Sequence, residues 1–295
     1  ITRRICESLC ATDLLGFQTI GDVRCFLDTV GEFVPGAAVD RNDHTVDLKG
    51  HTTSVKVYPI SINVEEVQRI ANTPRALDYE TKLAEDTGEV TIVRIDRAEP
   101  NKNIVRGFRA YELLLTRYPE LKGKVKFLAF LVPSRPHIRQ YQRYMDEIQQ
   151  VIQQINNNHG TDDWQPIVPF IENNYTQAIA GMKLYGVLLV NTIIEGMNLV
   201  AKEYVASRFD EDGVLILSPF TGAALELTDA LIVNPYAIEQ FADAIHQAVE
   251  MPQEERRWRM VQMREIVREN NIYKWAALMV EDLMQGARRS RRPVR

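Results

Sequence analysis

The residues most able to do chemistry surround a glycine turn. Segment 185–190 is an apolar run typical of a buried parallel strand, and segment 198–208 is typical of a helix. Gly196 lies in the turn between them, and Asn198 is a suitable N-cap. A strand, a glycine turn and a helix place free backbone N–H groups at the carboxyl edge of a sheet, where α/β proteins hold phosphates. Glu203, one turn into this helix, could reach ribose hydroxyls; an ordinary turn with a solvated glutamate is the alternative.

Two cations stand in another loop that would face the same crevice. Arg97 and Lys102 follow the strand-like segment 89–95, and Pro100 between them delays the next helix. A forked guanidinium and a compact ammonium there could neutralise a diphosphate without a metal. Surface charge near a turn is the alternative for this pair taken alone.

Two further turns follow predicted strands. Arg135 comes just after the strand-like segment 125–132 and could contact a phosphate or a substrate, and a surface salt bridge is an equal alternative. Gly222, followed by two alanines, makes a small-residue turn that lets a ligand or a backbone come close. Tight packing of a helix on a strand is the alternative there.

Composition excludes several classes of function. The 295 residues carry a net charge of −5, which gives no basic footprint for nucleic acid, and no apolar run is long enough for a membrane span. The chain has no GxSxG elbow, no phosphate-binding GKS/T loop and no paired metal-binding histidines. Cys6, Cys10 and Cys25 are predicted to be buried, reduced thiols. We therefore expect a cytoplasmic protein without metal or cofactor, and leave a homo-oligomer open.

Strand-like and helix-like segments alternate from about residue 89 onward, which predicts a doubly wound parallel sheet. The predicted strands are 89–95, 125–132, 167–171, 185–190, 213–217 and 231–233. An earlier hairpin is predicted around Gly50. We expect three parts: 1–75 from one domain, 76–270 as a second domain, and 271–295 as a terminal helix with a basic tail. Because the chain begins with Ile1 in what reads as the end of a helix, we expect its N-terminus to be incomplete.

Several motifs, in order, resemble the trehalose-6-phosphate synthases, the retaining glycosyltransferases of family 20. The resemblance covers residues 1–285, and the GMNLVAKE string is its most specific part. The segments that carry it are Asp13–Thr19, Tyr58–Ile62, Arg97–Lys102, Val132–Arg135, Gly196–Glu203, Gly222–Leu227 and Val233–Tyr236.

The resemblance implies two facing Rossmann-like domains of the GT-B type, of which only the last part of the first is present here. It implies transfer of glucose from UDP-, GDP- or ADP-glucose to glucose 6-phosphate, with retention, giving α,α-trehalose 6-phosphate. Arg135 would contact the acceptor phosphate. The implied catalytic residues are Arg97, Lys102 and Glu195. The implied donor-binding residues are Arg97, Lys102, Gly196, Met197, Asn198, Leu199, Val200 and Glu203.

Three departures from the family pattern keep alternatives open. Glu195 replaces an aspartate that touches the transferred sugar, and Asn103 replaces a common glycine. The half-domain that carries the family's glycine loop, catalytic histidine and most of the acceptor site is missing, so we expect this chain alone to be inactive. A glucosylglycerol-phosphate synthase, a pseudo-glycosyltransferase that forms a C–N bond, or a non-catalytic nucleotide-binding module are the alternatives.

Overall fold

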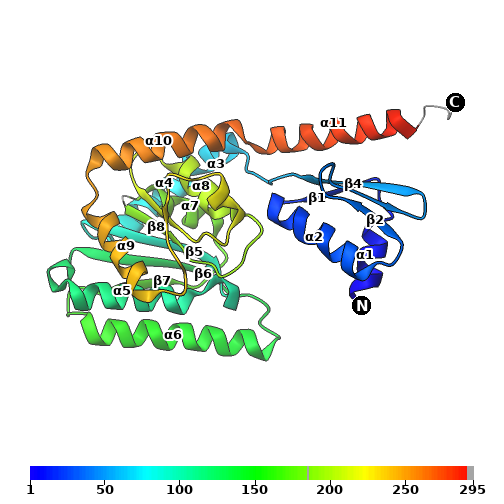
Figure 1. Ribbon diagram of the computed structural model, residues 1–295. Coiled ribbons are helices and arrows are strands. Elements are labelled where there is room, and N and C mark those ends of the chain that lie inside the picture. The colour runs from blue at the N-terminus through cyan, green and yellow to red at the C-terminus, as the bar shows by residue number, and fades with distance from the viewer. Residues whose placement is uncertain (185, 291–295) are drawn as a thin grey trace. The chain divides into compact units, whose positions relative to one another are not determined.

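The computed structural model describes residues 1–184 and 186–290, with side chains as far as Gly286 (Figure 1). Tyr185, the first residue of one predicted strand, and the end of the basic tail lie outside this range. The chain forms two compact units, Ile1–Ser61 with Asn270–Arg295, and Ile62–Glu269. The first division falls before the predicted limit at residue 75, because the two helices that follow Ser61 pack on helices of the larger unit.

The smaller unit contains a four-stranded sheet of order β1-β4-β3-β2. β3 and β4 form the predicted hairpin, while β1 lies parallel to β4. β2 was not predicted, and it pairs antiparallel with β3. Its elements are α1 (Thr2–Leu9), β1 (Leu14–Phe17), α2 (Ile20–Phe33), β2 (Ala37–Asp40), β3 (Thr45–Leu48), β4 (His51–Val57) and α11 (Ile272–Ser290).

The helix α2 packs an apolar stripe on this sheet. Thr19 and Asp22 cap its N-terminus reciprocally, and Val23 and Leu27 on the stripe are buried. Cys6 and Cys10 are buried as predicted, but Cys25 is exposed, so the prediction of three buried thiols was wrong. The helical period explains the difference, because it turns residue 25 away from the stripe.

The larger unit alternates strands and helices as predicted. Three short 3-10 turns, η1 (Pro100–Lys102), η2 (Pro119–Leu121) and η3 (Gly222–Leu225), follow strands or helices. Its strands are β5 (Val90–Arg97), β6 (Val125–Val132), β7 (Ile167–Phe170), β8 (Gly186–Val190), β9 (Val214–Leu217) and β10 (Leu231–Ile232). Its helices are α3 (Val64–Ala71), α4 (Pro74–Ala84), α5 (Ile104–Arg117), α6 (Arg139–His159), α7 (Tyr175–Lys183), α8 (Leu199–Ser207), α9 (Ile238–Glu250) and α10 (Gln253–Glu269).

The six strands form one parallel sheet of order β10-β9-β8-β5-β6-β7. α5, α6 and α9 cover one face, and α3, α4, α7, α8 and α10 cover the other (Figure 1). The prediction of a doubly wound parallel sheet is therefore confirmed. Strand order reverses between β5 and β8, and in such sheets ligands bind at the carboxyl ends of the two strands that flank this reversal.

The central strands are apolar and buried on both faces, as in other covered parallel sheets. Ile92, Leu128 and Leu188 are each fully buried. Arg94 and Asp96 break this pattern on β5, where both are also buried. Because a buried charge is costly unless it is paired, these two residues indicate that this part of the sheet belongs to a functional site as well as to the core.

Candidate functional site

The loop after β5 and the turn after β8 meet at the switch point of the sheet. Lys102 ends η1, and its ammonium lies 2.5 Å from a carboxylate oxygen of Glu195, in the turn after β8. The second oxygen of Glu195 accepts a 2.8 Å hydrogen bond from the side-chain amide of Asn198. Lys102 is only 5% exposed and also lies 3.4 Å from Asp96. Two segments that are 93 residues apart in sequence thus converge on one ion pair.

The N-terminus of α8 completes this arrangement. Asn198 caps the helix through a 2.9 Å hydrogen bond that its side-chain oxygen accepts from the N–H of Ala201. The first N–H groups of a helix, here those of Leu199 and Val200, have no acceptor within the helix and can bind an anion. Inside α8, Lys202 is fully buried and pairs with Glu226 at 2.9 Å.

A neighbouring turn holds the Gly196 turn in place. The N–H of Glu195 donates to the carbonyl of Phe220, and the N–H of Ala223 donates to the carbonyl of Met197. A Cβ on Gly222 would lie 2.1 Å from the carbonyl oxygen of Gly196. Gly222 therefore permits a close approach of two backbones, which is one of the two roles predicted for its turn.

Arg97 lies at the same edge but contacts a different partner. Its guanidinium donates to Glu99 at 2.6 Å, and the hydroxyl of Ser134 donates to the same carboxylate oxygen at 2.8 Å. Glu99 thus links the loop after β5 to the loop after β6. The side chain of Arg97 remains 60% exposed, which leaves it accessible to a ligand.

Glu203 lies on α8 beside a tyrosine from α7. The hydroxyl of Tyr175 donates a 2.9 Å hydrogen bond to Glu203. Burial raises the pKa of Glu203 to about 6, and the hydrogen bond from Tyr175 opposes this rise because it favours the ionised carboxylate.

Arg135, after β6, contacts an aromatic side chain of α6. Its backbone has a φ of 45°, and its guanidinium donates to the hydroxyl of Tyr141 at 2.7 Å. The guanidinium carbon also lies 5.1 Å from the centre of the Tyr141 ring. The aromatic ring therefore fixes the direction of this cation at the end of β6.

The sequence predictions missed the residues beneath Lys102. Arg94 and Asp96 are buried in the second half of β5, and Asn191 is buried directly after β8. Burial raises the pKa of Asp96, while the charges of Arg94 and Lys102 limit the rise. The sequence did contain a signal for these residues. Arg94 and Asp96 stand at positions i and i+2 of an apolar strand, so their side chains share one face of the sheet.

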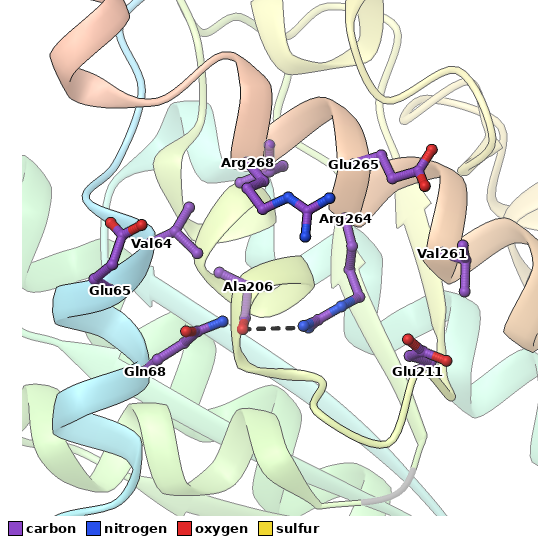
Figure 2. Close-up of a pocket in the computed structure, with 10 residues that line it drawn as sticks. Val64, Glu65, Gln68, Ala206, Glu211, Val261, Arg264, Glu265 and Arg268 are labelled. Carbon is purple, nitrogen blue, oxygen red and sulfur yellow. Dashed lines mark hydrogen bonds between the residues drawn. The ribbon is translucent and has the colours of Figure 1, made fainter.

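A hollow lies at the C-terminal end of α8, between α3, α8 and α10 (Figure 2). Its volume is about 280 Å³, and none of the predicted site residues line it. The guanidinium of Arg264 donates to the carbonyls of Val205 at 3.0 Å, Ala206 at 3.4 Å and Arg208 at 2.6 Å. These carbonyls lie at the C-terminal end of α8, where carbonyl oxygens have no N–H donor within the helix. Arg264 supplies donors there and therefore caps this helix.

Neither a metal site nor a membrane span is found in the described part of the chain. Residues 1–184 and 186–290 contain no group of three or more histidine, cysteine, aspartate or glutamate side chains arranged to hold a metal ion. No helix in the same ranges is long and apolar enough to cross a membrane.

Comparison with known proteins places this geometry in a family. The model of glycosyltransferase family 20 matches residues 1–285. The chain belongs to glycosyltransferase family 20. A trehalose-6-phosphate synthase from Klebsiella pneumoniae is 38% identical over 292 residues, which are 96% of this chain and 60% of that protein. The chain thus spans about 60% of the length of the curated relatives it matches.

Solved structures of family 20 proteins share this fold. An E. coli structure bound with UDP-2-fluoro glucose has a TM-score of 0.88 and 32% identity, over 96% of this chain and 63% of that one. A trehalose-phosphate synthase from Burkholderia xenovorans in complex with glucose-6-phosphate has a TM-score of 0.88 and 34% identity, with the same coverage. The GT-B expectation is therefore confirmed, and the chain covers about 63% of those structures.

One departure from the family 20 pattern has a local explanation. Asn103 has a φ of 56° and a ψ of 38°, in the left-handed region that glycine and asparagine adopt most readily. Its side-chain amide also donates to the carbonyls of Asn191 at 3.1 Å and Pro235 at 2.9 Å. Asparagine therefore supplies both the backbone conformation and a tie between two loops.

Proposed function

We propose that the larger unit binds a nucleoside-diphosphate glucose, and that the complete protein transfers the glucose to glucose 6-phosphate to form α,α-trehalose 6-phosphate. The observation that carries this proposal is the convergence of Lys102, Glu195 and the N-terminus of α8 at the switch point of the sheet. An ammonium and free helix N–H groups at one point form a site for the diphosphate. Glu203 on the same helix would then accept hydrogen bonds from the ribose.

The ion pair with Glu195 must change when the donor binds. Lys102 already faces two carboxylates, Glu195 at 2.5 Å and Asp96 at 3.4 Å. A diphosphate brings further negative charge toward this pair and repels Glu195. We infer that Glu195 then leaves Lys102 and turns to the hydroxyls of the sugar, while Lys102 and Arg97 bind the phosphates.

The chemical task in this proposal is to stabilise the leaving diphosphate. Once the donor is bound, Arg97 and Lys102 would already lie beside the phosphates, so they would need little further reorganisation as charge develops. Loss of one such preorganised donor typically costs about 3–4 kcal/mol of transition-state stabilisation. In the reaction with retention that we propose, the departing phosphate would deprotonate the acceptor, so no protein nucleophile is required. Arg135 would bind the acceptor phosphate.

The relatives support the substrate classes of this proposal. One E. coli relative is bound with UDP-2-fluoro glucose, and one Burkholderia relative is bound with glucose-6-phosphate. We propose the activity for a protein of the relatives' full length, because this chain covers about 63% of each of those two structures.

Two measurements test the proposal. Calorimetric titration of this chain with UDP, GDP and ADP should give binding to at least one of them, with no added metal. The complete protein should form trehalose 6-phosphate from a nucleoside-diphosphate glucose and glucose 6-phosphate. Absence of any nucleotide binding would overturn the assigned site.

A related transfer is the second candidate, and Glu195 is the observation that favours it. The side chain of Glu195 reaches Lys102. An aspartate at this position would place its carboxylate about one bond length from where the Glu195 carboxylate lies. This difference exceeds the tolerance of about 0.5 Å in a preorganised site. Product formation only with a different acceptor or donor would favour a glucosylglycerol-phosphate synthase or a C–N-forming relative. Nucleotide binding with no transfer to any acceptor would favour a non-catalytic module.

A further inference from the structure

A fully buried arginine lies beneath the ion pair of the candidate site. Arg94 is in the middle of the central strand β5, with none of its surface exposed. One terminal nitrogen donates to the side-chain oxygen of Asn191 at 2.6 Å. The other lies 2.5 Å from the carbonyl of Lys102 and 2.9 Å from Asp96. This one side chain therefore contacts the end of β8, the backbone of the Lys102 loop and the carboxylate next to the Lys102 ammonium.

Stability alone does not account for an arginine at this position. Burial of a guanidinium costs several kcal/mol, and apolar residues that replace a buried ion pair are often as stable or more stable. The neighbouring helix α5 also has a glycine, which has no side chain, next to Arg94. A Cβ on Gly107 of α5 would lie 2.5 Å from the Arg94 guanidinium and 3.3 Å from the Asn191 side chain. A glycine within a helix is itself unfavourable relative to alanine, so the space for Arg94 is a built feature of the chain.

The contacts of Arg94 affect both the charge beside the Lys102 ammonium and the position of the Lys102 backbone. Asp96 gives one carboxylate oxygen to Arg94, and its other oxygen lies 3.4 Å from the Lys102 ammonium. Without the Arg94 charge, the buried Asp96 carboxylate would draw Lys102 inward as its only cation. The hydrogen bond to the Lys102 carbonyl also fixes the backbone from which that side chain extends.

The same loop is tied to β8 by a reciprocal pair of amide hydrogen bonds. Asn191 donates to the carbonyl of Asn103 at 3.1 Å, and Asn103 donates to the carbonyl of Asn191 at 3.1 Å. Since Arg94 donates to the side chain of Asn191, it also orients the amide that makes one of these bonds. Arg94 therefore contacts this loop directly at the Lys102 carbonyl and indirectly through Asn191.

We propose that Arg94 is a positioning residue that holds Lys102 toward the diphosphate of the bound nucleotide, by neutralising Asp96 and by fixing the Lys102 backbone. Arg94 itself does not touch the ligand. This inference rests on the proposed function of Lys102. It predicts an effect on phosphate recognition that is separate from any effect on folding.

The test compares a nucleoside diphosphate with its nucleoside on the full chain. UDP is titrated by calorimetry and uridine by ligand-observed NMR, or GDP or ADP with its own nucleoside if that base binds more tightly. Arg94→Met should weaken UDP binding about tenfold or more, as expected when the charge-assisted contact between Lys102 and the diphosphate is lost. It should leave uridine binding unchanged. Gly107→Ala should give the same selective loss, because its new Cβ displaces the guanidinium while no charge is removed.

Arg208→Met is the matched control. Arg208 is also fully buried, and its guanidinium binds the carbonyls of Met182, Lys183 and Asp212, away from the Lys102 loop. It should lower the free energy of unfolding without changing the ratio of UDP to uridine affinity. Gly107→Ala also keeps the test decisive if Arg94→Met fails to fold.

The outcomes separate this inference from the proposed function. If Lys102→Ala binds UDP as wild type does, the proposed function is wrong. If Lys102→Ala weakens UDP binding but Arg94→Met and Gly107→Ala do not, only the role of Arg94 is overturned. Equal losses of UDP and uridine binding in both variants would also overturn it, because they would indicate a merely structural effect.

Discussion

Replacing Glu203 by glutamine should make the protein more stable and at the same time weaken nucleotide binding. Burial raises the pKa of Glu203 from an ordinary value of 4.5 to about 6. Each pKa unit corresponds to about 1.4 kcal/mol, so ionising this group costs about 2 kcal/mol more in the folded chain than in the unfolded chain. We propose that this cost is retained because the ionised carboxylate binds ribose hydroxyls.

The pH dependence of this cost has a definite sign. A carboxyl group with a raised pKa in the folded state binds its proton more tightly there, so its contribution to stability is lost as pH rises from about 4.5 through about 6. Glu203→Gln should therefore raise the free energy of unfolding by up to about 2 kcal/mol at pH 8 and give no gain at pH 4. Urea unfolding of both proteins across this range measures the difference. Tyr175→Phe removes the opposing hydrogen bond and should move the wild-type transition to higher pH.

The functional half of this prediction is measured with UDP at pH 8. Loss of hydrogen bonds to a charged group should cost about 1.5–3 kcal/mol, or about 10- to 150-fold in Kd. The terminal phosphate of UDP also titrates near pH 6, so the pH dependence of binding is compared between wild type and Glu203→Gln rather than used alone. A glutamine variant that binds UDP normally, or that is no more stable at pH 8, would refute this reasoning.

Three other substitutions test separate parts of the site. Glu195→Gln releases Lys102 from its ion pair and should tighten UDP binding by about 1 kcal/mol, about fivefold, with a smaller gain for UDP-glucose; weaker UDP binding would contradict the exchange of partners that we propose. Arg135→Ala in the complete protein should raise the KM for glucose 6-phosphate about tenfold or more and leave the Kd for UDP unchanged, so an effect on UDP would move Arg135 to the donor side. Arg264→Met removes the cap at the end of α8 and should lower the free energy of unfolding by about 1–3 kcal/mol in urea, while a changed Kd for UDP would show that this end of α8 influences the site.

Local patterns in the sequence predicted the larger unit well. Apolar runs such as Val125–Val132 and the alternation of strands with helices were sufficient for the doubly wound sheet. The strand β2 was missed because its conformation depends on pairing with β3, which no local pattern shows. Cys25 could have been placed on the surface from the helical spacing of its apolar neighbours.

The contacts of the site were beyond the reach of local patterns. Arg94 reads as one charge in a strand, and its partner Asn191 is 97 residues away. Gly107 reads as a weak point in a helix until the guanidinium beside it is seen. The motifs could place Lys102 and Glu195 at one edge of the sheet, but only the folded chain brings them to 2.5 Å.

The proposed function requires that Lys102 and the N-terminus of α8 hold a diphosphate. Calorimetric titration of UDP into this chain and into Lys102→Ala tests it directly, with uridine as the ligand without phosphates. We predict that the wild type binds UDP much more tightly than uridine, and that Lys102→Ala loses about 10- to 150-fold in UDP affinity. Equal UDP affinity in the two proteins, or equal affinity of the wild type for UDP and uridine, would contradict the claim.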